Sequence, residues 1–200
     1  MRLLILGAIG LAVAFMVGRL TAQEAAAPSC RMCPSTYIPA SEVAAYERIG
    51  RATGLTDQQM RSVDIGKSQV QIALVHRGKL DAPAPRSAAE HHLVSEVYYV
   101  ISGGGTNVTG PELVGAQERP SNDRAVRLLN GPGSNAAEIR NGTTHELAAG
   151  DVLVIPAGTG HQFTKIDDHI TYLMIRIDPD KVVPLMDEAA SRAYLQANAP

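Results

Sequence analysis

The chain has 200 residues, 45% of them hydrophobic and 19% charged, a composition typical of a globular protein with one core. It contains no Trp and only two Phe, and its formal net charge at pH 7 is -2. A platform for base stacking and a basic surface for phosphate backbones are both missing from this composition, so we expect no nucleic-acid partner.

The first predicted element is an export signal over residues 1–22. Arg2 precedes an apolar run over residues 3–17, and small residues near Ala22 offer a cleavage point. The run is shorter than the roughly 20 apolar residues of a membrane-spanning helix, although an uncleaved amino-terminal anchor is the alternative. We therefore expect a periplasmic or secreted protein without stable membrane insertion once the signal is cleaved.

An amino-terminal arm with one short helix is predicted over residues 23–60. Cys30 and Cys33 form a C-x-x-C pair, which could bind metal, cycle between thiol and disulfide, or form a local disulfide. Zinc would need a second pair of ligands, and Pro34 stands where haem attachment needs His. In an oxidising compartment, a disulfide pinning the arm is favoured. The helix is predicted over residues 41–50, with Ser41 as its cap.

Short strands with Gly and Pro turns dominate residues 61–180, and a helix near residues 187–196 lies in the closing segment 181–200. Strands are predicted at 70–75, 93–101, 125–129, 151–155 and 169–177, and a hairpin at 138–147 around Asn141-Gly142. The glycines at 103–105 are expected to end the strand before them. This pattern predicts an all-β sandwich or barrel, and the absence of an internal repeat favours one barrel.

Metal-ligand residues gather in two segments. Glu90 and His92 are two apart, so on a strand they share a face, and Glu96 follows four residues later. His161 follows a glycine-containing turn that would let it approach from a neighbouring strand. Carboxylate and imidazole together suit a divalent ion such as Fe, Mn, Zn or Ni. On this register His91 would point away from the site.

The second of these segments resembles the second motif of the cupin superfamily. Gly150-x5-Pro156-x-Gly158-x2-His161 matches that motif up to its last position, where Lys165 replaces the usual Asn.

The first segment resembles the later half of the first cupin motif, G-x5-H-x-H-x3–4-E-x6-G. His92-x3-Glu96-x6-Gly103 matches, the opening Gly is absent, and Glu90 replaces the first His. The resemblance spans about residues 69–177 and implies a single cupin barrel, also called a double-stranded β-helix or jelly roll, with short helices at both ends.

The resemblance implies a metal site made of Glu90, His92, Glu96 and His161. A competing register, His91-x4-Glu96, also satisfies the motif spacing, and it would place Ala89 at the first position and leave three ligands. A cupin that has lost its metal is a further alternative.

Tyr98 shares the expected face of Glu96, so we take Glu96 and Tyr98 as candidate catalytic residues that exchange protons with a substrate or hydrogen-bond to it. A packed core Tyr is the alternative. The resemblance implies a metal-dependent enzyme acting on a small polar molecule, with a dioxygenase as the favoured reaction. An isomerase or lyase and a non-catalytic small-molecule-binding protein are alternatives. A homodimer is an expectation from the family.

Overall fold

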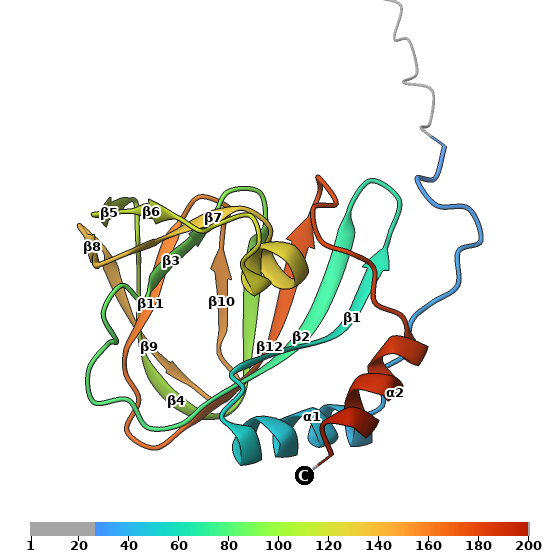
Figure 1. The fold of residues 1–200 in the computed structure, drawn as a ribbon, viewed down its shortest axis with the longest axis horizontal. Coiled ribbons are helices and arrows are strands. Elements are labelled where there is room, and N and C mark those ends of the chain that lie inside the picture. Colours follow the sequence, from blue (N-terminus) through green and yellow to red (C-terminus); the bar gives the residue numbers. More distant parts are fainter. Residues whose placement is uncertain (1–26, 200) are drawn as a thin grey trace, which may run out of the picture.

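The computed structural model describes residues 27–199, so the predicted export signal lies outside the described part of the chain (Figure 1). The first half comprises α1 (Ala40–Thr53), β1 (Asp57–Asp64), β2 (Gln69–Arg77), β3 (Ala88–His91), β4 (Ser95–Gly110), β5 (Glu112–Val114) and β6 (Gln117–Glu118). A π-helix (Val126–Asn130), β7 (Gly133–Ala136), β8 (Glu138–Arg140), β9 (Thr143–Ala148), β10 (Val152–Ile155), β11 (Gly160–Lys165), β12 (Ile170–Asp178) and α2 (Glu188–Ala197) follow. No helix within residues 27–199 is long and apolar enough to cross a membrane.

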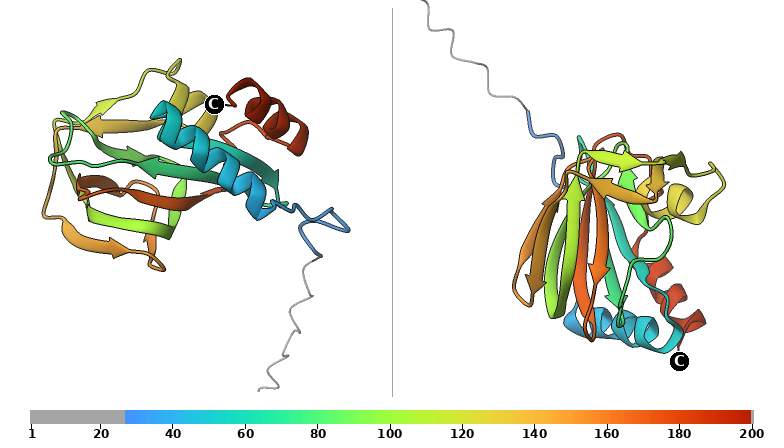
Figure 2. Two further views of the ribbon diagram at one scale, coloured as in Figure 1. Left: turned by 90° about the horizontal axis from the view of Figure 1, so that it is seen from below. Right: turned by 90° about the vertical axis from the view of Figure 1, so that its left-hand side faces the viewer.

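The strands form one antiparallel barrel in which β4 connects two halves. The main order is β1-β2-β12-β4-β11-β3-β7-β6, and β9 and β10 also pair with β4. The first part of β4 pairs with β10 and β12, whereas its second part pairs with β9 and β11. Figures 1 and 2 show the strands curling around a common interior, with the helices outside it. The predicted all-β barrel with a short helix at each end is confirmed.

The glycines at 103–105 bend β4 instead of ending it. Gly103 has a φ of +72°, and a Cβ there would collide with the carbonyl of His169. A Cβ on Gly104 would lie 2.5 Å from the carbonyl oxygen of Leu147. Glycine therefore permits a close backbone approach and a bulge at this point, and the strand continues to Gly110. The predicted strand end at these glycines was wrong.

Two further sequence expectations fail between residues 125 and 147. The predicted strand over 125–129 is a π-helix, in which Leu128 is exposed and Asp123 accepts a hydrogen bond from the backbone N–H of Ala125. Asn141 turns the chain with a φ of +56° as predicted, but β8 pairs with β5 and β9 with β4. The turn is present, and the hairpin pairing across it is not.

The two helices pack together against the outer face of β1 and β2. Tyr46 of α1 stacks on Tyr194 of α2 with ring centroids 5.3 Å apart, and buried Met60 and Leu74 lie beneath them. Pro39, not Ser41, occupies the cap position of α1, so the predicted Ser41 cap is wrong. The C-terminal helix is confirmed.

Cys30 and Cys33 are joined by a disulfide in the arm that precedes α1. The local disulfide favoured from the C-x-x-C spacing is therefore present in the structure.

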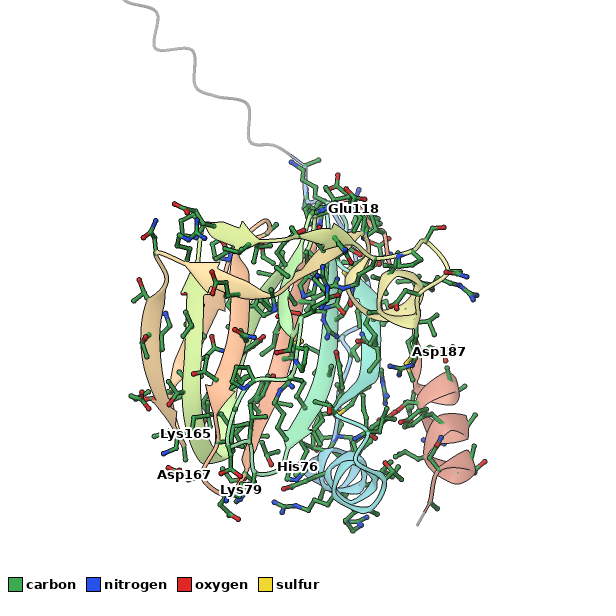
Figure 3. All side chains as sticks on the ribbon, turned by 60° about the vertical axis from the view of Figure 1, so that its left-hand side comes forward. His76, Lys79, Glu118, Lys165, Asp167 and Asp187 are labelled. Atoms are coloured by element: carbon green, nitrogen blue, oxygen red, sulfur yellow. A yellow bond between two sulfur atoms is a disulfide. The ribbon has the colours of Figure 1, made fainter. Side chains whose placement is uncertain are left out.

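The barrel interior has two chemically different ends. One end, here called the floor, is filled by stacked aromatic rings of Tyr98, Phe163 and Tyr172, with aliphatic side chains around them. The other end, here called the mouth, is lined by charged and amide side chains beneath the segment 117–130. Figure 3 labels Glu118 at the end of the barrel opposite the labelled Lys165 and Asp167.

Candidate metal centre

Three ligand-type side chains meet in the interior: His91, Glu96 and His161. All three are buried, and one ligand atom from each lies within 4.8 Å of the others. The Nε2 atom of His91 is 3.2 Å from Oε1 of Glu96, and Nε2 of His161 is 3.5 Å from Oε2. These separations bring two imidazole nitrogens and a carboxylate toward one point. We call this set the triad.

Strand pairing explains how the triad assembles. His161 on β11 pairs with Ala89 on β3, and both line the same cavity. Because alternate residues on a strand share a face, His91 joins Ala89 on the interior side. Glu96 reaches the same space from the start of β4.

The register favoured from the sequence is wrong at two of the four predicted ligands, Glu90 and His92. His91, not His92, faces the interior; the ring of His92 is 35% exposed, and its Nε2 lies 2.9 Å from Oε1 of Glu90. Glu90 is buried on the opposite face of β3, outside the triad. The rule that neighbouring residues face opposite ways holds. The error was to select the register that gave Glu90 a ligand role.

Glu96 is held in a fully protein-lined setting. Its Oε1 accepts hydrogen bonds from Nδ2 of Asn130 at 2.9 Å and from Nε of Arg176 at 3.3 Å. Burial raises the pKa of Glu96, but His91, His161 and Arg176 outweigh burial and hold that pKa well below the ordinary value. Glu96 is therefore a carboxylate at neutral pH, the form that a metal ion requires.

The two histidines differ in what contacts their second ring nitrogen. Nδ1 of His161 lies 3.2 Å from the carbonyl oxygen of Thr159, so it donates there and leaves Nε2 free of a proton. Burial lowers the pKa of His161 to about 4, which keeps this ring neutral. Nδ1 of His91 instead lies 3.3 Å from Nη1 of Arg119, and its Nε2 lies 3.1 Å from Nδ2 of Asn130 and 3.2 Å from Oε1 of Glu96.

These atoms fit a divalent metal ion. His161 has the tautomer of a metal-ligating histidine, and Glu96 is ionised. Nε2 of His91 faces Glu96 and would bind the ion in its unprotonated form, as metal binding to histidine requires. Two imidazoles and one carboxylate form the donor set of mononuclear iron sites that keep open coordination positions.

Tyr98 shares the interior face of Glu96, as predicted. Its hydroxyl donates to Oε2 of Glu96 at 2.8 Å, and its ring stacks on Tyr172 with centroids 4.4 Å apart. Burial and the adjacent Glu96 raise the pKa of Tyr98 well above its ordinary value, so it stays a phenol. The geometry combines both expectations for this residue, a core ring and a polar hydroxyl directed at the site.

A cavity of about 320 Å³ lies beside the triad. Three guanidinium groups line it, from Arg77, Arg119 and Arg176. Arg176 is fully buried and is ion-paired with both Asp57 and Glu96. The cavity size corresponds to the lower end of small-molecule sites, and its lining is unusually rich in charge for such a site.

A family model described as AraC-like ligand binding domain matches residues 140–199, which include β10, β11 and His161. This match covers less than half of the chain. Together with the barrel and the meeting of both motif segments at one triad, it supports the resemblance to the cupin superfamily. No curated protein matches the chain in sequence.

Several solved structures resemble this chain. A cupin protein from Bacteroides fragilis is 19% identical, with 56% of this chain and 68% of that chain covered and a TM-score of 0.34. A Bacillus halodurans protein is 14% identical, with coverages of 81% and 97% and a TM-score of 0.41. A recombinant oxalate oxidase in complex with glycolate is 16% identical, with coverages of 62% and 50% and a TM-score of 0.34.

The strand pairing decides how the first motif is aligned. Ala89 occupies the interior position of the motif's first His, and His91-x4-Glu96 supplies the rest. This is the competing register of the sequence analysis. The barrel interior therefore offers a three-residue donor set, and Glu90 is not a member of it.

Four side chains around the triad were missed from the sequence: Arg77, Arg119, Asn130 and Arg176. Arg77 lies two residues beyond the predicted strand 70–75, and alternation with Val75 could have placed it inside. Asn130 follows the predicted strand 125–129 and sits in a π-helix, an element often found at functional sites. No motif marked Arg119, since it lies in the irregular segment that covers the mouth.

Proposed function

We propose that this cupin is an exported metal-dependent enzyme that acts on a small polar molecule by a dioxygenase-type reaction. The observation that carries the proposal is the donor set of His91, Glu96 and His161, all buried and facing one cavity. Two histidines and one carboxylate leave coordination positions open to a substrate and to dioxygen. A site built only for structure would close its coordination with a fourth protein ligand.

The surrounding residues have definable tasks in such an enzyme. When bound, a divalent iron, manganese, zinc or nickel ion supplies Lewis-acid chemistry and, for iron, redox chemistry. Asn130 and Arg176 fix Glu96 through one oxygen, and Tyr98 holds the other. Tyr98 is also the nearest hydroxyl to Glu96, so it is placed to pass a proton to or from that carboxylate. The aromatic floor excludes water from this side.

Metal content and oxygen uptake test the proposal. The full mature chain is purified without chelator, reconstituted anaerobically with ferrous ion, and analysed for bound metal; we expect about one ion per chain. His161→Ala should lose this ion, whereas His169→Ala, a histidine outside the triad, should retain it. Oxygen consumption is then followed with a panel of small polar compounds.

Each outcome has a defined meaning. Oxygen uptake that requires both the ion and His161 supports the dioxygenase. An ion bound by the triad without oxygen uptake, but with turnover of a substrate, contradicts the dioxygenase and supports an isomerase or lyase. Absence of bound metal in the wild type, together with unchanged stability of Glu96→Ala and His161→Ala, removes the basis of any metalloenzyme.

A non-catalytic binding protein is the second candidate function. The family model that matches residues 140–199 describes a ligand-binding domain, which favours small-molecule binding without requiring turnover. In that case ligand would stabilise the chain against heat and be recovered unchanged.

Export and dimer formation belong to the same proposal. The Cys30–Cys33 disulfide supports an oxidising compartment, and the mass of the protein recovered from a periplasmic fraction would test cleavage near Ala22. Val152 and Val154 are 61% and 60% exposed beside Tyr99 on the outer face of β10 and β4. This apolar face supports a homodimer, which light scattering of the wild type and of Val152→Glu would test.

A further inference from the structure

Arg77 occupies an unusual position at the bottom of the cavity. It ends β2, and its side chain lies inside the barrel together with Ala73 and Val75. Its guanidinium carbon lies 5.3 Å from the centroid of the Phe163 ring. Phe163 shares the interior face of His161, two residues away, so the Arg77 head group approaches the triad from the floor.

The charge of Arg77 is not matched by an acidic partner. Its Nε donates to the hydroxyl of Tyr172 at 3.4 Å, and within residues 27–199 no carboxylate lies at salt-bridge distance from it. Its two Nη groups make no hydrogen bond to the described residues, and Arg77 is one of the residues that line the cavity. Arg77 is half-buried, and a cation partly withdrawn from water without a carboxylate is costly for folding, so its presence calls for a functional reason.

The other two arginines of the cavity are already engaged. Arg176 is ion-paired on both sides. Arg119 donates through Nε to Asn135 and through Nη2 to the carbonyl of Ser134, which leaves only Nη1, directed at His91. Arg77 alone among the three presents two free, parallel donors to the cavity.

The balance of charge points in the same direction. The cavity is lined by three arginines and three acidic residues, the latter being Asp57, Glu96 and Asp123. These formal charges cancel. A divalent ion at the triad would therefore leave the cavity with an excess of positive charge that only an incoming anion would neutralise.

We propose that the cavity binds a small organic carboxylate, whose carboxylate group is held end-on by the two Nη groups of Arg77 while its other polar end faces the triad. This inference rests on the proposed function and names the substrate class of the same site. A planar guanidinium fork matches a carboxylate in a bidentate pair. The volume of about 320 Å³ restricts the ligand to a small acid.

Binding of acids and their neutral amides tests this assignment. The full mature chain, in metal-free and metal-loaded forms, is titrated by calorimetry with acetate, malonate, succinate and glutarate and with the corresponding amides. We expect one of the acids to bind and its amide not to bind. Arg77→Met keeps the length of the side chain. This variant should lower the affinity for that acid by at least about 30-fold, the usual effect of removing one partner of a desolvated charge pair.

Arg140→Met is the matched control, since it removes one positive charge from an exposed pair with Glu138 outside the cavity. It should leave acid binding unchanged. Arg77→Met should keep its metal content and should be at least as stable to heat as the wild type, because a half-buried charge without a carboxylate partner has been removed. If Arg77→Met does not fold, Arg77→Lys replaces it; retention of charge without the fork should weaken binding about tenfold.

Several results would overturn the inference: equal binding of an acid and its amide, unchanged acid affinity in the folded Arg77 variant, or no binding by any of the four acids. Preference for inorganic phosphate or sulfate over the acids would also overturn it. Failure here is distinguishable from failure of the proposed function. Metal binding without acid binding contradicts only the Arg77 assignment, and acid binding through Arg77 without metal contradicts only the metalloenzyme.

Discussion

The floor and the mouth of the barrel differ in the kind of side chain that each withdraws from water. The floor is apolar and aromatic, and its rings pack as they do in an ordinary protein core. The mouth brings Arg, Glu, His and Asn side chains out of water around one small cavity. The floor therefore supplies stability, whereas the mouth is costly for folding, a cost that the proposed binding role would explain. The following predictions challenge that division.

The largest expected effect on stability belongs to the floor. Ile170 is fully buried, and Ile170→Ala should lower the free energy of unfolding by about 3 kcal/mol through lost burial and a cavity. Chemical denaturation measures the loss. Ile177→Ala on the same strand is the control, because Ile177 is 42% exposed and should lose under about 1 kcal/mol. Metal content should be unchanged in both variants; loss of metal in Ile170→Ala would erase the distinction between floor and mouth.

The ion pair between Arg61 and Glu42 lies outside the mouth, and we expect it to stabilise the fold. Arg61 is buried and donates to both carboxylate oxygens of Glu42, at 2.6 and 3.0 Å. Burial raises the pKa of Glu42, but hydrogen bonds from Arg61 and Ser191 outweigh it, and the net pKa is lowered. Glu42→Gln should cost about 2–3 kcal/mol at pH 7, because Arg61 is left unpaired.

The same pair gives a pH dependence with a defined sign. Since the folded-state pKa of Glu42 lies below its unfolded value of about 4.5, its contribution is fully present above pH 4.5. It disappears as the pH falls through the lower folded value. Denaturation of the wild type and Glu42→Gln across this range should therefore show curves that converge at acidic pH. A constant difference between them would contradict the linkage.

Removal of the positive charge of Arg119 at the mouth should increase the affinity of the triad for a metal ion. Nη1 of Arg119 lies 3.3 Å from His91, so its charge opposes a cation at the triad. Arg119→Met should raise the affinity for a divalent ion by about tenfold, measured by competition with a chelating dye. Arg86→Met is the control, since Arg86 lies outside the cavity and donates to the carbonyl of Gly115. A weaker affinity in Arg119→Met would show that Arg119 supports the ligand geometry instead.

The smallest predicted effect concerns a buried polar residue that the division into an apolar floor and a polar mouth does not explain. Asn107 on β4 is fully buried, and neither polar atom of its side chain has a hydrogen-bond partner within residues 27–199. It pairs across the sheet with Phe163. Asn107→Leu should therefore raise the free energy of unfolding by about 1 kcal/mol. A loss of stability would indicate a buried water that serves both atoms.

The fold was readable because its signals are local. Alternation at Val70–Leu74 and the turn at Pro156-Ala157-Gly158 follow directly from strand periodicity and turn chemistry, and both appear in the structure. The glycines at 103–105 misled because glycine serves both a chain end and a close approach of two strands. Sequence alone does not contain the neighbouring carbonyls that decide between the two uses.

The candidate site was readable in part for the same reason. Glu96 and His161 sit at fixed motif spacings, and the structure brings them together. The choice between His91 and His92 depended on which face of a four-residue strand points inward, a matter settled by pairing with β7 and β11. Arg77 and Asn130 reach the cavity only through tertiary packing. Their metal and substrate roles stay predictions.

The bend in β4 has a consequence for motion. Because one continuous strand belongs to both halves of the barrel, those halves cannot part without breaking its covalent and hydrogen-bonded continuity. We therefore expect the largest local fluctuations in the short strands β6 and β7 and in the π-helix between them. Amide protons at the middle of β4 should exchange with solvent among the slowest in the chain. Fluctuations of the π-helix would then set how fast a molecule reaches and leaves the interior.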